Sequence, residues 1–106
     1  MQVIYLCEKE SEEFMGKVRM HMIFTGRVQG VGFRYRASYA AKGLGVTGWV
    51  KNQQDGTVEM EAQGSEAQIQ KMLKMLQTDS FIAIHKIESE ELPLKEQEQG
   101  FRVKGY

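Results

Sequence analysis

A glycine-rich stretch, GRVQGVGFR from Gly26 to Arg34, separates two different hydrophobic patterns. Before it, apolar and polar residues alternate from Lys17 to Thr25, which predicts a β-strand. After it, apolar residues recur at helical spacing: Phe33, Ala37, Ala40, Ala41 and Leu44. A glycine-rich turn between a strand and a helix N-terminus is a candidate anion cradle, because glycine lets main-chain N–H groups approach a ligand closely. We therefore expect this loop to hold a phosphoryl group, with Arg34 close enough to bind the same anion.

The residues after this helix predict a β-hairpin. The segment VTGWVK, Val46 to Lys51, is rich in strand formers. The pair Asp55-Gly56 is typical of a tight turn, and residues 57–62 alternate again between polar and apolar. We expect two strands joined by a turn at Asn52–Gly56, with the acidic residues of the second strand on a partly solvated face.

A second helix and a further strand follow the hairpin. Ser65 and Gln68 form a capping box at the predicted helix start. Apolar residues then follow at helical spacing: Ile69, Met72, Leu73 and Leu76. The next strand is predicted at Phe81–Glu88, where the spacing of Ile84 and Ile87 indicates a bulge or a change of face.

The order of these elements predicts the fold class. A polar loop at Leu92–Gly100 and a short strand at Phe101–Lys104 end the pattern. Strand, helix, strand, strand, helix, strand and a terminal strand match an α+β, ferredoxin-like split βαβ (βαββαβ) sandwich. Such a fold has an antiparallel sheet with two helices on one face, which would bury both apolar helical stripes.

Length and composition indicate a single globular domain. The chain has 106 residues, of which 42% are hydrophobic and 26% charged. Residues 17–106 carry the domain pattern, whereas residues 1–16 form an N-terminal extension in which MQVIYLC favours a short strand. The single cysteine, Cys7, excludes an internal disulfide and a thiolate zinc cluster. Because no apolar run could span a bilayer and the N-terminus is a poor signal peptide, we expect a cytoplasmic protein.

The distribution of charge is uneven, although the net charge is zero. A net charge of zero gives no global indication of nucleic-acid or membrane binding. Between Gly26 and Gln54 every charged residue is basic: Arg27, Arg34, Arg36, Lys42 and Lys51. Two interpretations stay open, namely ordinary solvated positions and a local positive field for a small anion.

The isolated histidines and tyrosines are predicted to have no chemical role. His21 is expected to be half-exposed on the first strand, and His85 structural or exposed, since neither has a second ligand nearby in sequence. Tyr35 and Tyr39 lie four residues apart in the first helix, a spacing that we interpret as packing.

A second candidate motif, GWVKN from Gly48 to Asn52, ends the strand that follows the first helix. An asparagine side chain donates and accepts hydrogen bonds at once. Asn52 could therefore hold a water molecule by its carbonyl while its amide contacts a phosphoryl oxygen. The alternative is a turn-forming role before Asp55-Gly56. We expect Asn52 and Arg34 to lie at the same edge of the sheet.

The residue types in the two motifs restrict the chemistry. Neither motif contains a histidine, a cysteine or a carboxylate pair, and no acidic cluster suits magnesium. Main-chain N–H groups, an arginine and an asparagine suit phosphoryl transfer to water by positioning and charge stabilisation. Without a general acid the leaving group must be a stable anion, such as a carboxylate, whose conjugate acid has a pKa of about 4. This indicates a mixed carboxylic–phosphoric anhydride. No acyl pocket is evident, which favours broad tolerance of acyl groups.

The two motifs together resemble the signature stretches of the acylphosphatase family. GRVQGVGFR and GWVKNQQDGTVEMEAQG, Gly48 to Gly64, have the family's order and spacing. The resemblance covers roughly Lys17 to Tyr106, and the closing FRVKGY looks like the family's last strand. It implies a ferredoxin-like sandwich and metal-free, cofactor-free hydrolysis of an acyl phosphate to carboxylate and inorganic phosphate. The expected protein is a monomer that binds neither nucleic acid nor membrane.

The resemblance also implies roles for individual residues. The family's phosphate loop corresponds to Gln29, Gly30, Val31, Gly32, Phe33 and Arg34. Its essential arginine corresponds to Arg34, which would bind the phosphoryl oxygens. Its essential asparagine corresponds to Asn52, which would orient the attacking water. Phe24 stands where the family usually has an aliphatic residue, which predicts a mild change in the core.

Two alternatives to an enzyme remain. The first is a non-catalytic, anion-binding domain of the same fold. The second is an RNA-binding module, because GVGFRY superficially resembles an aromatic RNA-binding signature. Its predicted place in a loop and a helix start, instead of a central strand, argues against that module.

Overall fold

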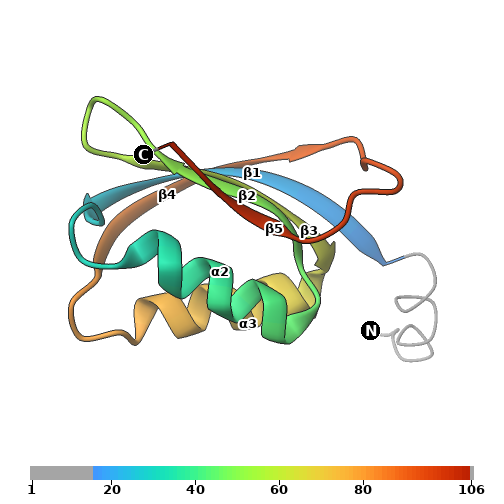
Figure 1. The fold of residues 1–106 in the computed structure, drawn as a ribbon, viewed down its shortest axis with the longest axis horizontal. Helices are drawn as coiled ribbons and strands as arrows, with labels where there is room; N and C mark the ends of the chain where they lie inside the picture. The colour runs from blue at the N-terminus through green and yellow to red at the C-terminus, as the bar shows by residue number, and fades with distance from the viewer. Residues whose placement is uncertain (1–15, 106) are drawn as a thin grey trace, which may run out of the picture.

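The computed structural model describes residues 16–105 and consists of a five-stranded sheet with two helices packed on one face (Figure 1). The elements in chain order are β1 (Lys17–Arg27), α2 (Phe33–Leu44), β2 (Thr47–Asn52), β3 (Val58–Ser65), α3 (Glu66–Gln77), β4 (Ala83–Leu92) and β5 (Phe101–Lys104). The strand predicted at MQVIYLC lies outside the described residues.

The sheet confirms the predicted ferredoxin-like α+β class. The strand order is β4-β1-β3-β2-β5, and the first four strands pair antiparallel. The terminal strand β5 pairs in parallel with β2, with Gly48 opposite Phe101, and so adds a parallel edge to the predicted antiparallel sheet. Neither α2 nor α3 is long and apolar enough to cross a membrane.

The core lies between the sheet and the helices. Alternate residues of the strands face the helices, because side chains in a strand point to opposite faces in turn. Alanines at Ala37, Ala40 and Ala41 form the buried face of α2 and allow the helix to approach the sheet closely. Phe24 of β1 is fully buried, and its ring centroid lies 4.9 Å from that of Phe33. The first residue of α2 is thereby anchored in the core beside the end of β1.

The predicted capping box is present at the start of α3. The Ser65 hydroxyl accepts a hydrogen bond from the Gln68 main-chain N–H at 3.1 Å, and the Gln68 side chain accepts one from the Ser65 N–H at 2.8 Å. The Gln68 side-chain amide also donates to the Leu44 carbonyl at 2.7 Å. One residue therefore caps α3 and ties it to the end of α2.

The bulge predicted in β4 is confirmed, but the strand occupies a later range than Phe81–Glu88. Thr25 pairs with Lys86 and Gly26 with Ile84, so His85 is the extra residue. Gly26 has φ 139°, and a Cβ there would lie 2.1 Å from the Ala83 carbonyl oxygen, so only glycine fits. The strand continues to Leu92 because pairing with β1 continues to Arg19.

Candidate functional site

The loop between β1 and α2 presents main-chain N–H groups at a helix N-terminus. Gly30 and Gly32 have φ angles of 76° and 81°, a left-handed conformation that favours glycine. Gly32 is the N-cap of α2 and has no side chain with which to cap it. The first N–H groups of any helix lack intrahelical acceptors, and the helix dipole makes this end positive. This geometry makes the loop a candidate anion-binding site.

A cavity of about 170 Å³ opens at this helix start and brings the two sequence motifs together. It is lined by Val28, Gly30, Gly32, Phe33, Arg34, Tyr35 and Asn52. Arg34 lies in the first turn of α2, and Asn52 is the last residue of β2. The predicted meeting of Arg34 and Asn52 at one edge of the sheet is therefore observed. Val31 is not part of the lining and packs against the hydrophobic core.

Arg34 is held by the C-terminal strand. Its Nη1 donates a hydrogen bond to the main-chain carbonyl of Lys104, the last residue of β5, at 3.1 Å. This contact joins residues that are 70 positions apart in the sequence. The residue types give no sign of this contact, because any residue can supply a main-chain acceptor. The strand FRVK therefore contributes to the site as well as to the sheet.

Gln29 connects the glycine loop to the β2–β3 hairpin. Its side-chain amide donates to the carbonyls of Gln53 and Thr57, at 2.7 and 2.8 Å. These carbonyls flank the turn, and the Gln53 N–H donates in turn to the Thr57 carbonyl at 2.9 Å. The Gln29 side chain therefore holds the hairpin beside the loop, and Gln29 is absent from the residues that line the cavity.

Further polar contacts fix the hairpin that carries Asn52. The Asp55 carboxylate accepts hydrogen bonds from the Thr57 hydroxyl and N–H, at 2.6 and 3.0 Å, and these bonds lower the pKa of Asp55. The Gln53 side chain donates to Glu59 at 2.7 Å, and Glu59 contacts His21 at 2.7 Å. Asp55 therefore closes the turn. Among residues 16–105, we observe no hydrogen bond to the side-chain amide of the half-buried Asn52.

The basic residues around the site have different partners. Arg36 forms an ion pair with Asp79, with Nε and Oδ2 separated by 3.0 Å, so its charge is compensated. Arg34 is the cation that lines the cavity. At the cavity, positive charge therefore comes from Arg34 and from the N-terminus of α2.

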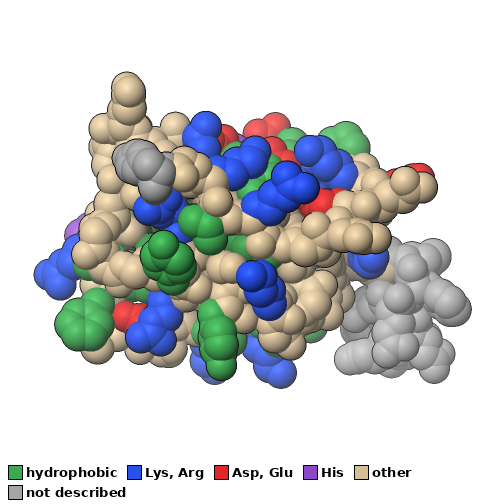
Figure 2. Space-filling model, in the orientation of Figure 1, with side chains coloured by type: hydrophobic (Ala, Val, Ile, Leu, Met, Phe, Trp, Pro, Cys, Tyr) green, Lys and Arg blue, Asp and Glu red, His purple; other side chains and the backbone are tan. Residues whose placement is uncertain are grey.

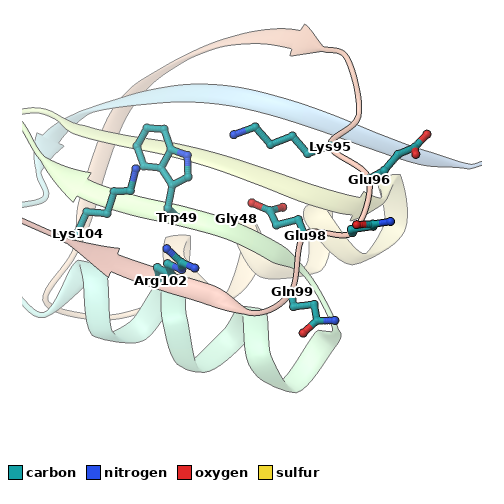
Figure 3. Close-up of a pocket in the computed structure, with 9 residues that line it drawn as sticks. Gly48, Trp49, Lys95, Glu96, Glu98, Gln99, Arg102 and Lys104 are labelled. Atoms are coloured by element: carbon teal, nitrogen blue, oxygen red, sulfur yellow. The ribbon is translucent and has the colours of Figure 1, made fainter.

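A larger cleft of about 610 Å³ lies on the face of the sheet that the helices do not cover, along β2, β5 and the loop before β5 (Figure 3). Lys104 lies over the Trp49 ring, with its Nζ 4.4 Å from the ring centroid. Basic side chains gather on this part of the surface (Figure 2), including Lys95 and Arg102 of the cleft. The cleft contains neither the glycine loop nor Asn52. We assign the candidate site to the smaller cavity, because it combines helix N–H donors, an arginine and an asparagine.

The histidines and tyrosines singled out in the sequence have the following places in the structure. Within residues 16–105, no group of three or more His, Cys, Asp or Glu side chains could hold a metal ion. His21 is half-buried against Glu59, and His85 is exposed at the bulge, as predicted. Cys7 lies outside the described residues. The prediction that Tyr35 and Tyr39 pack is wrong, because these side chains are 72% and 78% exposed.

The chain is similar in sequence to known acylphosphatases. The acylphosphatase family model matches residues 20–103. An acylphosphatase from Geobacillus thermodenitrificans is 44% identical over 86 residues, which cover 80% of this chain and 92% of that protein.

The chain is also similar in structure to solved acylphosphatases. The crystal structure of acylphosphatase from Bacillus subtilis superposes with a TM-score of 0.76 at 34% identity, covering 83% of this chain and 99% of that chain. The acylphosphatase structure from Coxiella burnetii gives a TM-score of 0.75 at 31% identity, covering 84% and 94%.

Proposed function

Because the chain belongs to the acylphosphatase family and is an enzyme that hydrolyses acyl phosphates, we propose that the cavity at the start of α2 is its active site. The observation that carries this proposal is the composition of the cavity lining. It joins the glycine loop, Arg34 and Asn52, which come from two separate motifs. Among residues 16–105, no carboxylate, histidine or cysteine lines the cavity.

The phosphoryl group is bound by the loop and by Arg34. Main-chain N–H groups of Gly30 to Arg34 surround its oxygens, and the positive end of α2 favours its negative charge. The guanidinium of Arg34 offers two parallel donors to two of these oxygens. Its bond to the Lys104 carbonyl, at 3.1 Å, supports this role because it limits the orientations of the side chain before substrate binds.

Asn52 orients the attacking water. Its side-chain oxygen accepts a hydrogen bond from the water, and its amide donates to a phosphoryl oxygen. The closed turn of the β2–β3 hairpin and the Gln29 contacts support this role, since they fix the main chain around Asn52. The protein thus contributes position and charge to the reaction.

The reaction balances without a catalytic acid. The water oxygen forms a new bond to phosphorus, and the bond between phosphorus and the bridging oxygen breaks. The bridging oxygen leaves with the electron pair as a carboxylate, whose conjugate acid has a pKa of about 4. The water protons stay with the product, dihydrogen phosphate. The lining therefore suits acyl phosphates, because the alkoxide leaving group of an alkyl phosphate would need a strong general acid, and the described lining offers neither a carboxyl group nor an imidazolium for that role.

The test is hydrolysis of benzoyl phosphate in the presence of EDTA, with the native chain, Arg34→Lys and Arg102→Lys. Lysine keeps the charge of Arg34 but loses the planar fork, so we expect kcat to fall about 10²-fold or more. Arg102 is an exposed arginine of β5, and Arg102→Lys serves as the matched control.

The outcomes separate the alternatives. The assigned site would be supported if the native chain and Arg102→Lys hydrolysed benzoyl phosphate in EDTA and Arg34→Lys did not. Near-native turnover by Arg34→Lys would refute the role of Arg34. Absence of turnover by folded native chain that still binds inorganic phosphate would indicate a non-catalytic anion-binding domain.

A further inference from the structure

We propose that Tyr35 forms the contact surface for the acyl group, and that it makes this enzyme favour aromatic acyl phosphates over small aliphatic ones. This inference rests on the proposed active site at the start of α2. It concerns the acyl group of the substrate, whereas the glycine loop, Arg34 and Asn52 are assigned to the phosphoryl group and the attacking water.

The size of the cavity places the acyl group outside it. The cavity holds about 170 Å³. A cavity of about 150 Å³ accommodates benzene, a ring of six heavy atoms. Phosphorus, its three terminal oxygens, the bridging oxygen and the attacking water are also six heavy atoms. The reacting group therefore fills the cavity, and the carbon skeleton of the substrate extends beyond its mouth.

The geometry of the reaction limits which lining residues can contact the acyl group. In phosphoryl transfer the attacking and leaving oxygens lie roughly in line through phosphorus. With the water at Asn52, the acyl group points away from Asn52. Within residues 16–105, the other side chains of the lining belong to Val28, Phe33, Arg34 and Tyr35.

Of these four side chains, Tyr35 is the one available to a group outside the cavity. Val28 and Phe33 are each 1% exposed and belong to the core. Arg34 is assigned to the phosphoryl oxygens and bonds to the Lys104 carbonyl. Tyr35 is 72% exposed while it also lines the cavity. Because side chains in a helix lean toward its N-terminus, we place the exposed Tyr35 ring beside the mouth of the cavity, where the acyl group emerges.

Large apolar side chains project from the surface over α2 and the α3–β4 connection (Figure 2), and Tyr39 is one of the exposed residues there. Tyr39 lies one helical turn after Tyr35 and is 78% exposed, but it is absent from the cavity lining. It therefore provides a matched control for an exposed tyrosine that does not meet the substrate.

The chemistry of a tyrosine ring predicts which acyl groups are bound more favourably. An aromatic acyl group can stack on the ring or meet its edge, whereas an acetyl group offers one methyl group. The interaction free energy of a pair of aromatic rings is enough to change a binding equilibrium or a rate by about twofold to tenfold. We expect a preference of that size to depend on Tyr35.

The experiment compares kcat/KM for benzoyl phosphate with kcat/KM for acetyl phosphate. The ratio is measured for the native chain, Tyr35→Ala, Tyr35→Phe and Tyr39→Ala. Because every variant receives the same two substrates, the difference in their intrinsic reactivity cancels when ratios are compared. We expect the ratio to fall by about twofold to tenfold in Tyr35→Ala. Tyr35→Phe keeps the ring, so its ratio should match the native ratio, as should that of Tyr39→Ala.

Two results would overturn the inference while leaving the proposed function intact. One is a ratio that is unchanged in Tyr35→Ala. The other is an equal fall in Tyr39→Ala, which would show a general surface effect. If the native chain hydrolysed neither substrate, the proposed function itself would be refuted, and the inference with it.

Discussion

Arg34 and Asn52 line one cavity, but their side chains are held in different ways. The Arg34 guanidinium is fixed by the Lys104 carbonyl, at 3.1 Å. The Asn52 amide has no hydrogen-bond partner among residues 16–105, although Lys51 before it pairs with Glu59 in the sheet and the Gln53 side chain after it also bonds to Glu59. A polar side chain of this kind is available to bind water in a hydrated cavity. Arg34 is thus suited to binding the anion, and Asn52 to orienting the nucleophile.

This difference predicts separate effects on binding and turnover. Asn52→Ala should lower kcat for benzoyl phosphate by about 10²-fold to 10³-fold, because the attacking water loses its orienting group. The inhibition constant of inorganic phosphate should change by less than about threefold, since the loop and Arg34 hold the anion. Gln54→Ala, which removes an exposed amide from the same hairpin, is the control. Equal losses of turnover and phosphate affinity in Asn52→Ala would mean that Asn52 shapes the loop.

At the scale of elements, the site depends on one clamp between the glycine loop and the β2–β3 hairpin. Gln29 makes two hydrogen bonds to hairpin carbonyls, at 2.7 and 2.8 Å. Each such bond contributes about 0.5–1.5 kcal/mol. Gln29→Ala should therefore lower the free energy of unfolding by about 1–3 kcal/mol, as measured by urea denaturation. Gln29→Glu should lower it further at neutral pH, because a carboxylate would face two carbonyl oxygens.

If the Gln29 side chain instead bound phosphate directly, a different result would be expected. In that case Gln29→Ala would weaken inhibition by inorganic phosphate and leave the unfolding curve unchanged. That result would contradict the clamp.

The elements themselves were largely predictable from periodicity and capping, because both signals are local. The helix at Phe33–Leu44, the capping box and the bulge in β4 follow from residue spacing and side-chain chemistry. The positions of Tyr35 and Tyr39 were not predictable from spacing, since a helix that packs on one face exposes the other. Their four-residue interval places them on a common face, and tertiary packing decides which face is buried.

At the scale of the whole molecule, a buried arginine lies under the loop before β5. Arg19 belongs to the polar positions of the alternating strand β1, yet it is 1% exposed. The loop before β5 covers this end of the sheet. The Lys95 main chain bonds to the Gln63 side chain twice, at 2.9 Å each, and Glu98 reaches Arg19 at 2.7 Å. The path of a long loop over a sheet depends on such non-local contacts, and alternation along one strand carries no information about them.

The cluster around Arg19 predicts how stability depends on pH. Arg19 also donates to Glu61 at 2.8 Å and to Gln63 at 3.1 Å, so its buried charge has several acceptors. Burial acts to raise the pKa of Glu98, but hydrogen bonds from Arg19 and Thr47 outweigh it and hold that pKa below its usual value. A carboxyl whose pKa is lower in the folded state stabilises the fold above its unfolded pKa, about 4.3 for glutamate. This stabilisation is lost as the pH falls through the lowered, folded pKa.

Glu98→Gln should therefore destabilise the protein at pH 7 and have a smaller effect at pH 3. The variant replaces a charge-assisted bond to a buried guanidinium with a neutral one, so we expect a loss of about 1–3 kcal/mol at neutral pH. As the pH falls below the unfolded pKa toward the lowered pKa of folded Glu98, the native chain loses part of this stabilisation, so the two unfolding curves should lie closer together. Glu96→Gln, at an exposed position of the same loop, is the control and should follow the native curve at both pH values. A difference between Glu98→Gln and the native chain that stays constant from pH 7 to pH 3 would show that packing, and not the charge on Glu98, holds the loop over the sheet.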